Sequence, residues 1–450
     1  MSTRKGSVTI FLTLLMTIFL ILCLVLLEGV RVYFLRVNAL QAMELAEFSA
    51  LSEYQKELFE HYGLFFLELD YEQGSERTEV LENRLRKYLD SNTEEIQTES
   101  LSVKNICRAT DAGGSSFFEQ AAEVMKLQSG YKAFEELIGN LGHVQLEEVD
   151  LGELLEKNEN TAKAVLGSLN ENDEELKFSI SIPDIRFPSI KVLRDAVLGD
   201  ETGLSEKSIN LDERISTRNL SIGAGKKEKD TFMDKEMFHA YVFSNFGYYG
   251  AQNPHVWDSS LEYQLEYIVS GKESDLYNLE NVMWRIFLLR AGGNYLFYHQ
   301  DSYELGKAQA EAAGLAGFSG NPFLIEAVTE ILLISRAIED GIVQTRQIFA
   351  GDKVPLYEKG MFSGVFLGYE EYLYLFLESE QQEDKIFRCM DLVEMEIREK
   401  SGYEKFSLDH CTDRFEVQWN YRFDSLFYKL GYFAEGVYKN EINRKVFYEN

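Results

Sequence analysis

The hydrophobic pattern of the chain begins with one long uncharged segment. Residues 8–27 read VTIFLTLLMTIFLILCLVLL, without a charged residue, a proline or a glycine. A helix of about 20 residues rises roughly 30 Å, which matches the hydrocarbon thickness of a bilayer, and it satisfies its own backbone polar groups in lipid. The pattern therefore predicts a transmembrane helix over residues 8–27, preceded by a short tail of residues 1–7.

A cleaved secretory signal and a buried helix of a soluble protein are the two other interpretations of this segment. The apolar region of a cleaved signal is only about 7 to 15 residues long and is followed by small residues at the cleavage site. Here the apolar run is longer, and Glu28, Gly29, Val30 and Arg31 follow it. We therefore expect an uncleaved anchor.

The charges beside the span determine its expected orientation. Arg4 and Lys5 lie immediately before it, whereas Arg31 and Arg36 follow it. Cytoplasmic flanks carry an excess of Lys and Arg, and the N-terminal pair lies packed against the membrane. We expect a single-pass protein of the cell membrane with a cytoplasmic N-terminus and an extracytoplasmic region from about residue 30 onward.

Apolar residues continue at helical spacing beyond the span, and Gly63 stands where a helix C-cap is expected. This pattern predicts a membrane-proximal amphipathic helix over residues 28–62. A half-buried rod that carries a head, as in pilin-type subunits, and a stalk helix packed on its own domain both fit it. Glu28 and Arg31 are three residues apart at the membrane edge, so they form a candidate pair that either simply ends the span or serves assembly.

The remaining pattern predicts a mainly α fold with minor β, an α+β arrangement in a helix-rich extracytoplasmic region. Short apolar runs and helical segments predict a small α+β head over residues 63–172. Residues 173–230 are polar and linker-like, with a strand near residues 178–182 and a flexible loop over residues 221–230. Residues 231–450 predict a helix-rich domain with a C-terminal strand. Its expected helices span residues 237–246, 261–270, 279–298, 308–317, 322–350, 369–377 and 386–400, and its strand spans residues 415–423.

Composition limits the classes of partner. The net charge of −30 and the pI near 4.7 argue against nucleic acid, whose phosphates the chain would repel. With 45% hydrophobic residues, the exterior is able to form packed cores. We therefore expect a folded, acidic exterior that binds no nucleic acid.

The four cysteines do not form a disulfide scaffold. Cys23 lies in the span, which leaves Cys107, Cys389 and Cys411 outside it. Three cysteines allow at most one intramolecular bridge, and Cys389 with Cys411 is one possible pair.

Motifs for catalysis, cofactors and metals are missing from the sequence. No H-E-x-x-H occurs, and the six histidines are scattered. The stretch 223–226 (GAGK) fails the P-loop pattern because Lys227 occupies the Ser/Thr position. His410 next to Cys411 and near Asp413 fits a strand-edge turn better than a metal site. We expect no catalytic residue, no cofactor and no metal.

Short motifs at both ends of the span and across the exterior form a recognisable set. They are residues 5–12 (KGSVTIFL), 27–31 (LEGVR), 53–58, 62–66, 266–272 (EYIVSGK), 278–279, 289–290, Asn294, 351–356, 369–373, Arg388, Met390 and Asp391. The set resembles the TadE/TadG-like proteins of bacterial tight-adherence (Tad) pilus gene clusters. This resemblance implies a pseudopilin-like protein of the cell surface whose partners are the lipid bilayer and pilus or secretion-machine subunits.

The resemblance also implies a candidate processing site. Pilin-like precursors are commonly cut after a glycine and carry a glutamate at the fifth position beyond the cut. Gly6 and Ser7 fit the cut, but Phe11 occupies the fifth position. An uncleaved anchor is therefore the better expectation.

Two functions from different classes follow. The first is a membrane-anchored, pilin-like structural or assembly component of a Tad-type pilus or secretion system, without catalytic activity. The alternative is a membrane-tethered extracytoplasmic enzyme or binding domain that acts on cell-wall or carbohydrate material.

Overall fold

The computed structural model describes residues 3–69, 78–127, 141, 149–172, 187–199, 203–227, 230–251, 260–356, 365–400, 402–426 and 436–448. The fold is mainly α with minor β, as predicted. The chain forms two compact units. Unit 1 comprises Met1–Val124, Asn219–Thr231 and Ile397–Asn450, and unit 2 comprises Met125–Arg218 and Phe232–Glu396.

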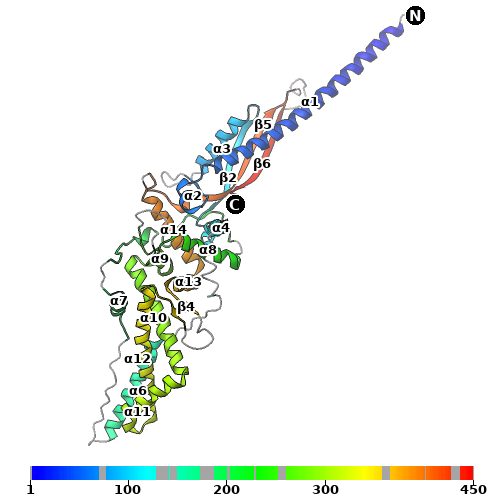
Figure 1. Cartoon of the computed structure of the whole chain (residues 1–450). Coiled ribbons are helices and arrows are strands. Elements are labelled where there is room, and N and C mark those ends of the chain that lie inside the picture. Colours follow the sequence, from blue (N-terminus) through cyan, green and yellow to red (C-terminus); the bar gives the residue numbers. More distant parts are fainter. Residues whose placement is uncertain are drawn as a thin grey trace. The chain divides into compact units, whose positions relative to one another are not determined.

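Unit 1 is built on helix α1 (Thr3–Leu51) and an antiparallel sheet, and Figure 1 shows α1 running along this sheet. Strand β5 (Cys411–Asp424) pairs with β2 (Gln97–Arg108) on one side and with β6 (Val437–Phe447) on the other. The short β1 (Leu67–Glu68) pairs with the beginning of β5. Helix α3 (Thr78–Asn92) packs beside α1 and against β2.

The inner face of the sheet forms the core of unit 1. The predicted strand is confirmed as part of β5, because its alternating aromatic and apolar residues are all buried. Trp419 lies between Leu101 of β2 and Ile442 of β6. Strand residues alternate between the two faces, so one face packs on α1 and α3 while polar residues such as Gln418 lie on the other.

The predicted continuous helix over residues 28–62 is wrong between Leu51 and Lys56. Helix α1 ends at Leu51, and the separate helix α2 (Lys56–Tyr62) follows. Gln55 explains the break, because its backbone N–H donates to the carbonyl of Phe66 at 2.7 Å while its side chain caps α2. The expected C-cap is present, since Gly63 has a left-handed φ of 70°.

The sheet joins segments that are distant in the sequence. The head predicted over residues 63–172 is completed by β5 and β6 from the C-terminal region, and β6 was not predicted at all. Residues 219–231 also belong to unit 1 rather than to a linker. The predicted strand near residues 178–182 lies outside the described residues.

Unit 2 is helical in the described part of the chain, apart from two short strands. Its core includes α10, α12, α11, α6 and α7, whose apolar faces pack together. The helices predicted over residues 231–400 are present with shifted ends. The unit contains α6 (Leu151–Asn172), α7 (Ile190–Leu198), α8 (Phe232–Asn245), α9 (Gln264–Ser270), α10 (Asp275–Gln300), α11 (Ser302–Ala316), α12 (Pro322–Phe349), β3 (Val354–Pro355), β4 (Phe366–Leu367), α13 (Tyr369–Ser379) and most of α14 (Gln382–Arg398).

Helices α6 and α7 were not predicted. Both helices belong to unit 2, although residues 151–172 were predicted within the head and residues 190–198 within the linker. More than half of the residues of α6 are polar or charged. Leu151, Leu155 and Ala162 nevertheless line up on the buried side of α6 and join the core formed with α12. Helix α4 (Asp111–Leu127) begins in unit 1 with a turn, because Ala112, Gly113 and Gly114 have left-handed φ values of 52°, 76° and 78°. All four cysteines are free thiols.

Candidate functional site

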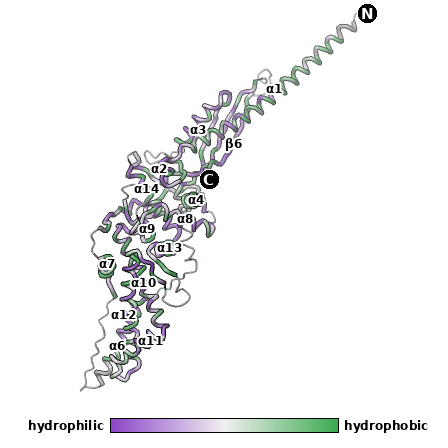
Figure 2. Tube along the Cα trace, in the orientation of Figure 1, coloured by the Kyte–Doolittle hydropathy of each residue, from purple (hydrophilic) through white to green (hydrophobic). Residues whose placement is uncertain are grey.

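The N-terminal half of α1 is apolar and uncovered. Its most hydrophobic window has a mean hydropathy of 3.1, and none of that window is buried. Figure 2 shows this hydrophobic run at the beginning of α1. Among the described helices, α1 alone is long and apolar enough to cross a membrane. Gly6 and Ser7 lie in its first turns, ahead of the predicted span.

Beyond residue 27, α1 carries apolar residues on two opposite sides. The inner side contributes Leu35, Ala39, Ala42, Met43, Ala46 and Ala50 to the core of unit 1. The outer side exposes Val30, Tyr33, Phe34, Leu45 and Phe48, and we call these five residues the outer stripe. Tyr33 and Phe48 are 71% and 74% exposed. A helix that served only as a scaffold for its own sheet would be expected to carry polar residues there.

Glu28 and Arg31 connect α1, directly after the predicted span, to other segments of unit 1. Glu28 is only 2% exposed, and its Oε1 accepts a hydrogen bond of 3.2 Å from the backbone N–H of Leu426. Arg31 donates to Oε2 of Glu95 at 2.6 Å and to the carbonyl of Asp424 at 2.9 Å. The direct Glu28–Arg31 contact is longer, at 3.9 Å, so this pair is mainly a link between α1 and other segments.

A second group of polar contacts lies farther along α1. Arg444 of β6 contacts Glu44 at 2.9 Å and Glu47 at 3.3 Å, and Arg36 donates to Asn440 at 3.1 Å. Burial raises the pKa of Glu47 to about 7, against the opposing effect of Arg444. These contacts fix the register between α1 and β6.

The GAGK stretch is a clamped loop rather than a flexible one. The carboxylate of Asp111 accepts hydrogen bonds from the backbone N–H groups of Gly223 at 2.7 Å, Gly225 at 2.9 Å and Arg108 at 2.8 Å. A Cβ atom at Gly223 would lie 2.3 Å from Oδ2 of Asp111, so the loop approaches too closely for a side chain. The backbone N–H groups that could bind a phosphate are thus occupied by the protein's own carboxylate. In the sequence, only the Gly-x-Gly spacing drew attention to this loop. Nothing in that spacing identified Asp111 as the residue that binds the loop.

Several of the exterior motifs singled out in the sequence form a buried polar network in unit 2. Tyr369 donates to Oε1 of Glu266 at 2.6 Å, and Tyr267 donates to Oδ2 of Asp391 at 2.8 Å. Arg388 donates to the carbonyls of residues 268 and 269 at 2.8 and 2.9 Å. Motif residues from α9, α13 and α14 therefore bond to one another, which indicates a structural role for them.

Burial makes two carboxylates of this network easier to protonate. It raises the pKa of Glu266 to about 7 and that of Asp391 to about 6. Oε2 of Glu266 is buried and has no hydrogen-bond partner among the described residues. With a pKa of about 7, both the protonated and the ionised form of Glu266 would be populated near neutral pH, so this group responds to pH within the physiological range.

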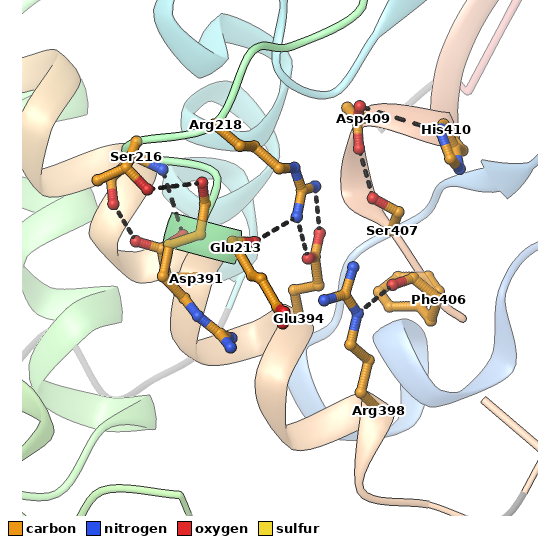
Figure 3. A network of polar contacts seen from close by, with 12 residues as sticks. Glu213, Ser216, Arg218, Asp391, Glu394, Arg398, Phe406, Ser407, Asp409 and His410 are labelled. Carbon is orange, nitrogen blue, oxygen red and sulfur yellow. Dashed lines mark hydrogen bonds and ion pairs between the residues drawn. The ribbon is translucent and has the colours of Figure 1, made fainter. Parts of the chain in front are cut away.

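Figure 3 shows further ion pairs and hydrogen bonds, some between residues of unit 2 and others between residues of unit 1. In unit 2, Arg218 forms a two-pronged contact with Glu394, at 2.6 and 2.9 Å, and Ser216 donates to Asp391 at 2.5 Å. In unit 1, Arg398 donates to the carbonyl of Phe406 at 2.6 Å. A forked pair between an arginine and a carboxylate fixes the orientation of the two side chains in addition to bringing their opposite charges together.

The fold and these contacts define a mainly helical protein with one N-terminal helix able to cross a membrane. Residues 186–361 and 357–423 match the Family of unknown function (DUF5702), and together they cover more than half of the chain. The chain belongs to this family. The matched region contains the Glu266–Asp391 network, whereas α1 lies outside it. No curated protein and no solved structure matches the chain.

Proposed function

We propose that the chain is a membrane-anchored, pilin-like structural or assembly component of a Tad-type pilus or secretion system, without catalytic activity. Residues 8–27 span the cell membrane, the N-terminus lies in the cytoplasm, and the chain from about residue 30 onward is extracytoplasmic. The stem is α1, and the rest of unit 1 is its head.

The observation that carries this proposal is the two-sided apolar character of α1. Its first half is uncovered and fits lipid, and the same helix then packs its inner side on the sheet of unit 1. The outer stripe remains exposed beyond the membrane edge. An apolar stripe at helical spacing is suited to a helix of another subunit, which would cover the side that unit 1 leaves open.

The contacts of Arg31 support the same proposal. They hold the head against α1 directly after the span, so the sheet follows the stem from the membrane edge onward. An assembly that positions subunits through their stems requires this kind of fixed connection between stem and head.

The first test locates the chain in cells that make pili. Mass spectrometry of the sheared surface fraction should detect peptides of this protein together with pilus subunits. The N-terminal peptide distinguishes an anchor that begins at Met1 from one cut before Ser7. Absence from both the surface fraction and affinity-purified assembly complexes would contradict the proposal.

The second test uses the outer stripe. Tyr33→Glu and Phe48→Glu place a charge on the exposed side of α1, away from the core, so the head should remain folded while co-purification with pilus subunits falls. Asn420→Glu, on the polar outer face of the sheet, adds the same charge to unit 1 and is the matched control. Equal co-purification of all three variants would remove the stripe from the proposal.

A further inference from the structure

The outer edge of strand β6 carries a row of backbone groups that point away from the sheet. In an antiparallel pair, residues alternate between those that bond to the neighbouring strand and those whose N–H and C=O point to the other side. At the two ends of β6, the N–H of Tyr448 donates to the carbonyl of Asp413 at 3.4 Å, and the N–H of Ser425 donates to the carbonyl of Gly436 at 2.6 Å. The even-numbered residues of β6 therefore bond to β5. The odd-numbered residues point to the outer edge, and they are Val437, Lys439, Glu441, Asn443, Lys445 and Phe447.

This outer edge, which we call the β6 edge, is open in the part of the chain that the structure describes. All of its odd-numbered residues are exposed. Among the described strands, β6 pairs with β5 alone, and no described residue outside this pair forms a hydrogen bond with the backbone of an odd-numbered residue of β6. An exposed strand of 11 residues with unpaired backbone groups is a template for a further strand.

The opposite edge of the sheet is obstructed. The N–H of Val103 in β2 donates to Oε1 of Glu82 at 2.8 Å, and the carbonyl of Ile106 accepts a hydrogen bond of 2.8 Å from the N–H of Ala224. A β-bulge also interrupts the pairing of β2 with β5 in this region. Covering and bulging protect an edge strand, so the β6 edge of one copy is unable to continue onto the β2 edge of the next.

The direction of β6 disfavours a second copy as the occupant of the β6 edge. Arg36 contacts Asn440 and Glu44 contacts Arg444, so α1 and β6 run in the same direction. Antiparallel pairing of two β6 strands would direct their predicted spans to opposite sides, which one membrane does not allow. Parallel pairing of the same two edges would set the apolar α1 face of one sheet beside the polar outer face of the other. The first of these arguments rests on the membrane anchor of the proposed function.

The side chains along the β6 edge favour acidic residues in an added strand. The Nζ atoms of Lys439 and Lys445 lie 3.7 Å from Glu99 and 3.6 Å from Glu416, respectively. Both distances exceed that of a hydrogen bond, so each ammonium group retains donors for a further carboxylate. On the opposite face of β6, Ile442 belongs to the core of unit 1, so an added strand would extend that core with apolar residues.

We propose that the β6 edge binds an extended segment of a different protein as an additional strand of the sheet. The outer face of this segment carries acidic residues beside Lys439 and Lys445, and its inner face carries apolar residues beside Ile442. The backbone of β6 supplies the hydrogen bonds, and the two lysines select the charge of the segment.

A synthetic strand tests the proposal on the full chain in detergent. The labelled peptide Val-Glu-Val-Thr-Val-Thr-Val-Glu-Val reads the same in both directions, so it is able to place its glutamates beside Lys439 and Lys445 in either orientation. We expect saturable binding by fluorescence anisotropy and slower hydrogen exchange at the amides of Glu441 and Asn443. A peptide that is N-methylated at two neighbouring central residues keeps the charge but loses N–H donors, so it should bind at least about tenfold more weakly.

An exchange of charge tests the selection by the two lysines. Replacing both glutamates of the peptide by lysine should weaken binding by about tenfold, because two exposed ion pairs become two repulsions. The double variant Lys439→Glu with Lys445→Glu should reverse this preference.

Asn443 provides a matched pair of variants for the backbone. Asn443→Pro removes one outward N–H at an edge position, where proline is tolerated, and should weaken peptide binding by at least about tenfold. Asn443→Thr removes the same side-chain hydrogen bond to Glu441 but keeps the backbone N–H, so it should bind the peptide like the parent chain.

Any of five results would overturn the proposal. They are no binding of the peptide, equal binding of its N-methylated form, equal binding of its two charge forms, equal binding by Asn443→Pro and Asn443→Thr, or a dimer of the chain whose β6 edge amides are protected without peptide. The last result would assign the β6 edge to a second copy. If Asn443→Pro fails to fold by circular dichroism, the N-methylated peptide and the exchange of charge still decide the outcome. Absence of the chain from pili would contradict the proposed function and leave these measurements unaffected.

Discussion

The phenol of Tyr369 donates a hydrogen bond of 2.6 Å to Oε1 of Glu266, a carboxyl group that is fully buried in unit 2. The two residues are far apart in the sequence and lie on α13 and α9. Their contact joins two of the short sequence motifs, residues 266–272 and 369–373, and both lie in the region matched by the family model. It also places an ionisable group where water does not reach it.

Glu266 should make the stability of unit 2 depend on pH. Its folded-state pKa of about 7 lies above the ordinary value of 4.5, so the folded form holds the proton more tightly. The stabilising effect of this group is fully present below pH 4.5 and is lost as the pH rises through 7. Hydrogen exchange of α9 and α13 between pH 5 and pH 8 measures it, after correction for the intrinsic pH dependence of exchange.

Glu266→Gln should flatten this dependence while keeping an acceptor for Tyr369. His239 and Lys385 also have pKa values lowered by burial, so the informative quantity is the difference between variant and parent chain. Glu262→Gln, at an exposed neighbouring position, is the control and should retain the parent's dependence. Identical slopes for parent and Glu266→Gln would contradict the raised pKa.

The Asp111 clamp should tolerate no side chain at its glycines. Gly223→Ala places a methyl group 2.3 Å from Asp111 and 2.6 Å from the carbonyl of Ile106, so we expect a loss of about 1–3 kcal/mol in the stability of unit 1. Gly29→Ala is the matched control, because a Cβ there meets no atom within 4 Å. Thermal unfolding followed by circular dichroism compares them, and equal unfolding temperatures would show that the loop adjusts freely.

Arg31 should be coupled more strongly to Glu95 than to Glu28. The corresponding distances are 2.6 and 3.9 Å, and an exposed ion pair such as Arg31–Glu95 typically contributes about 0.2–1 kcal/mol. Double-mutant cycles that combine Arg31→Gln with Glu95→Gln or with Glu28→Gln measure the two coupling energies by denaturant unfolding. A larger coupling energy for the Arg31–Glu28 cycle would contradict this prediction and favour the simple membrane-edge pair that the spacing predicts.

The fork between Arg218 and Glu394 should not accept lysine. The Glu394 side chain is almost fully buried, and lysine is unable to reproduce the two parallel hydrogen bonds. We expect Arg218→Lys to reduce local stability by about 1–3 kcal/mol. Hydrogen exchange of residues 211–218 and 391–396 measures the change, and the double variant Arg218→Met with Glu394→Leu should recover part of it. If Arg218→Lys left the hydrogen-exchange protection of these residues unchanged, the paired hydrogen bonds between Arg218 and Glu394 would contribute little to stability.

The sequence by itself determined the elements whose signal is local. A run of twenty uncharged, predominantly apolar residues predicts a helix of membrane length, because a helix satisfies its own backbone hydrogen bonds within lipid. The strict alternation from Phe415 to Phe423 predicts a strand with one buried face, because strand side chains point to opposite sides in turn. Gly63 indicated a C-cap, because glycine adopts the left-handed conformation without a steric penalty.

Only the tertiary structure decided which surfaces meet. Periodicity shows where α1 carries apolar residues, but not that β6, some 400 residues later, supplies Arg444 to Glu44. The glycine-rich stretch of residues 223–226 is compatible with a flexible loop or with an anion site. Only the tertiary structure shows that the carboxylate of Asp111 binds its backbone N–H groups and holds the loop in place. Glu28 looked like a surface charge at the membrane edge, yet the backbone of Leu426 contributes to its buried environment. Such contacts depend on chain segments brought together by packing, and no pattern within either segment specifies its partner.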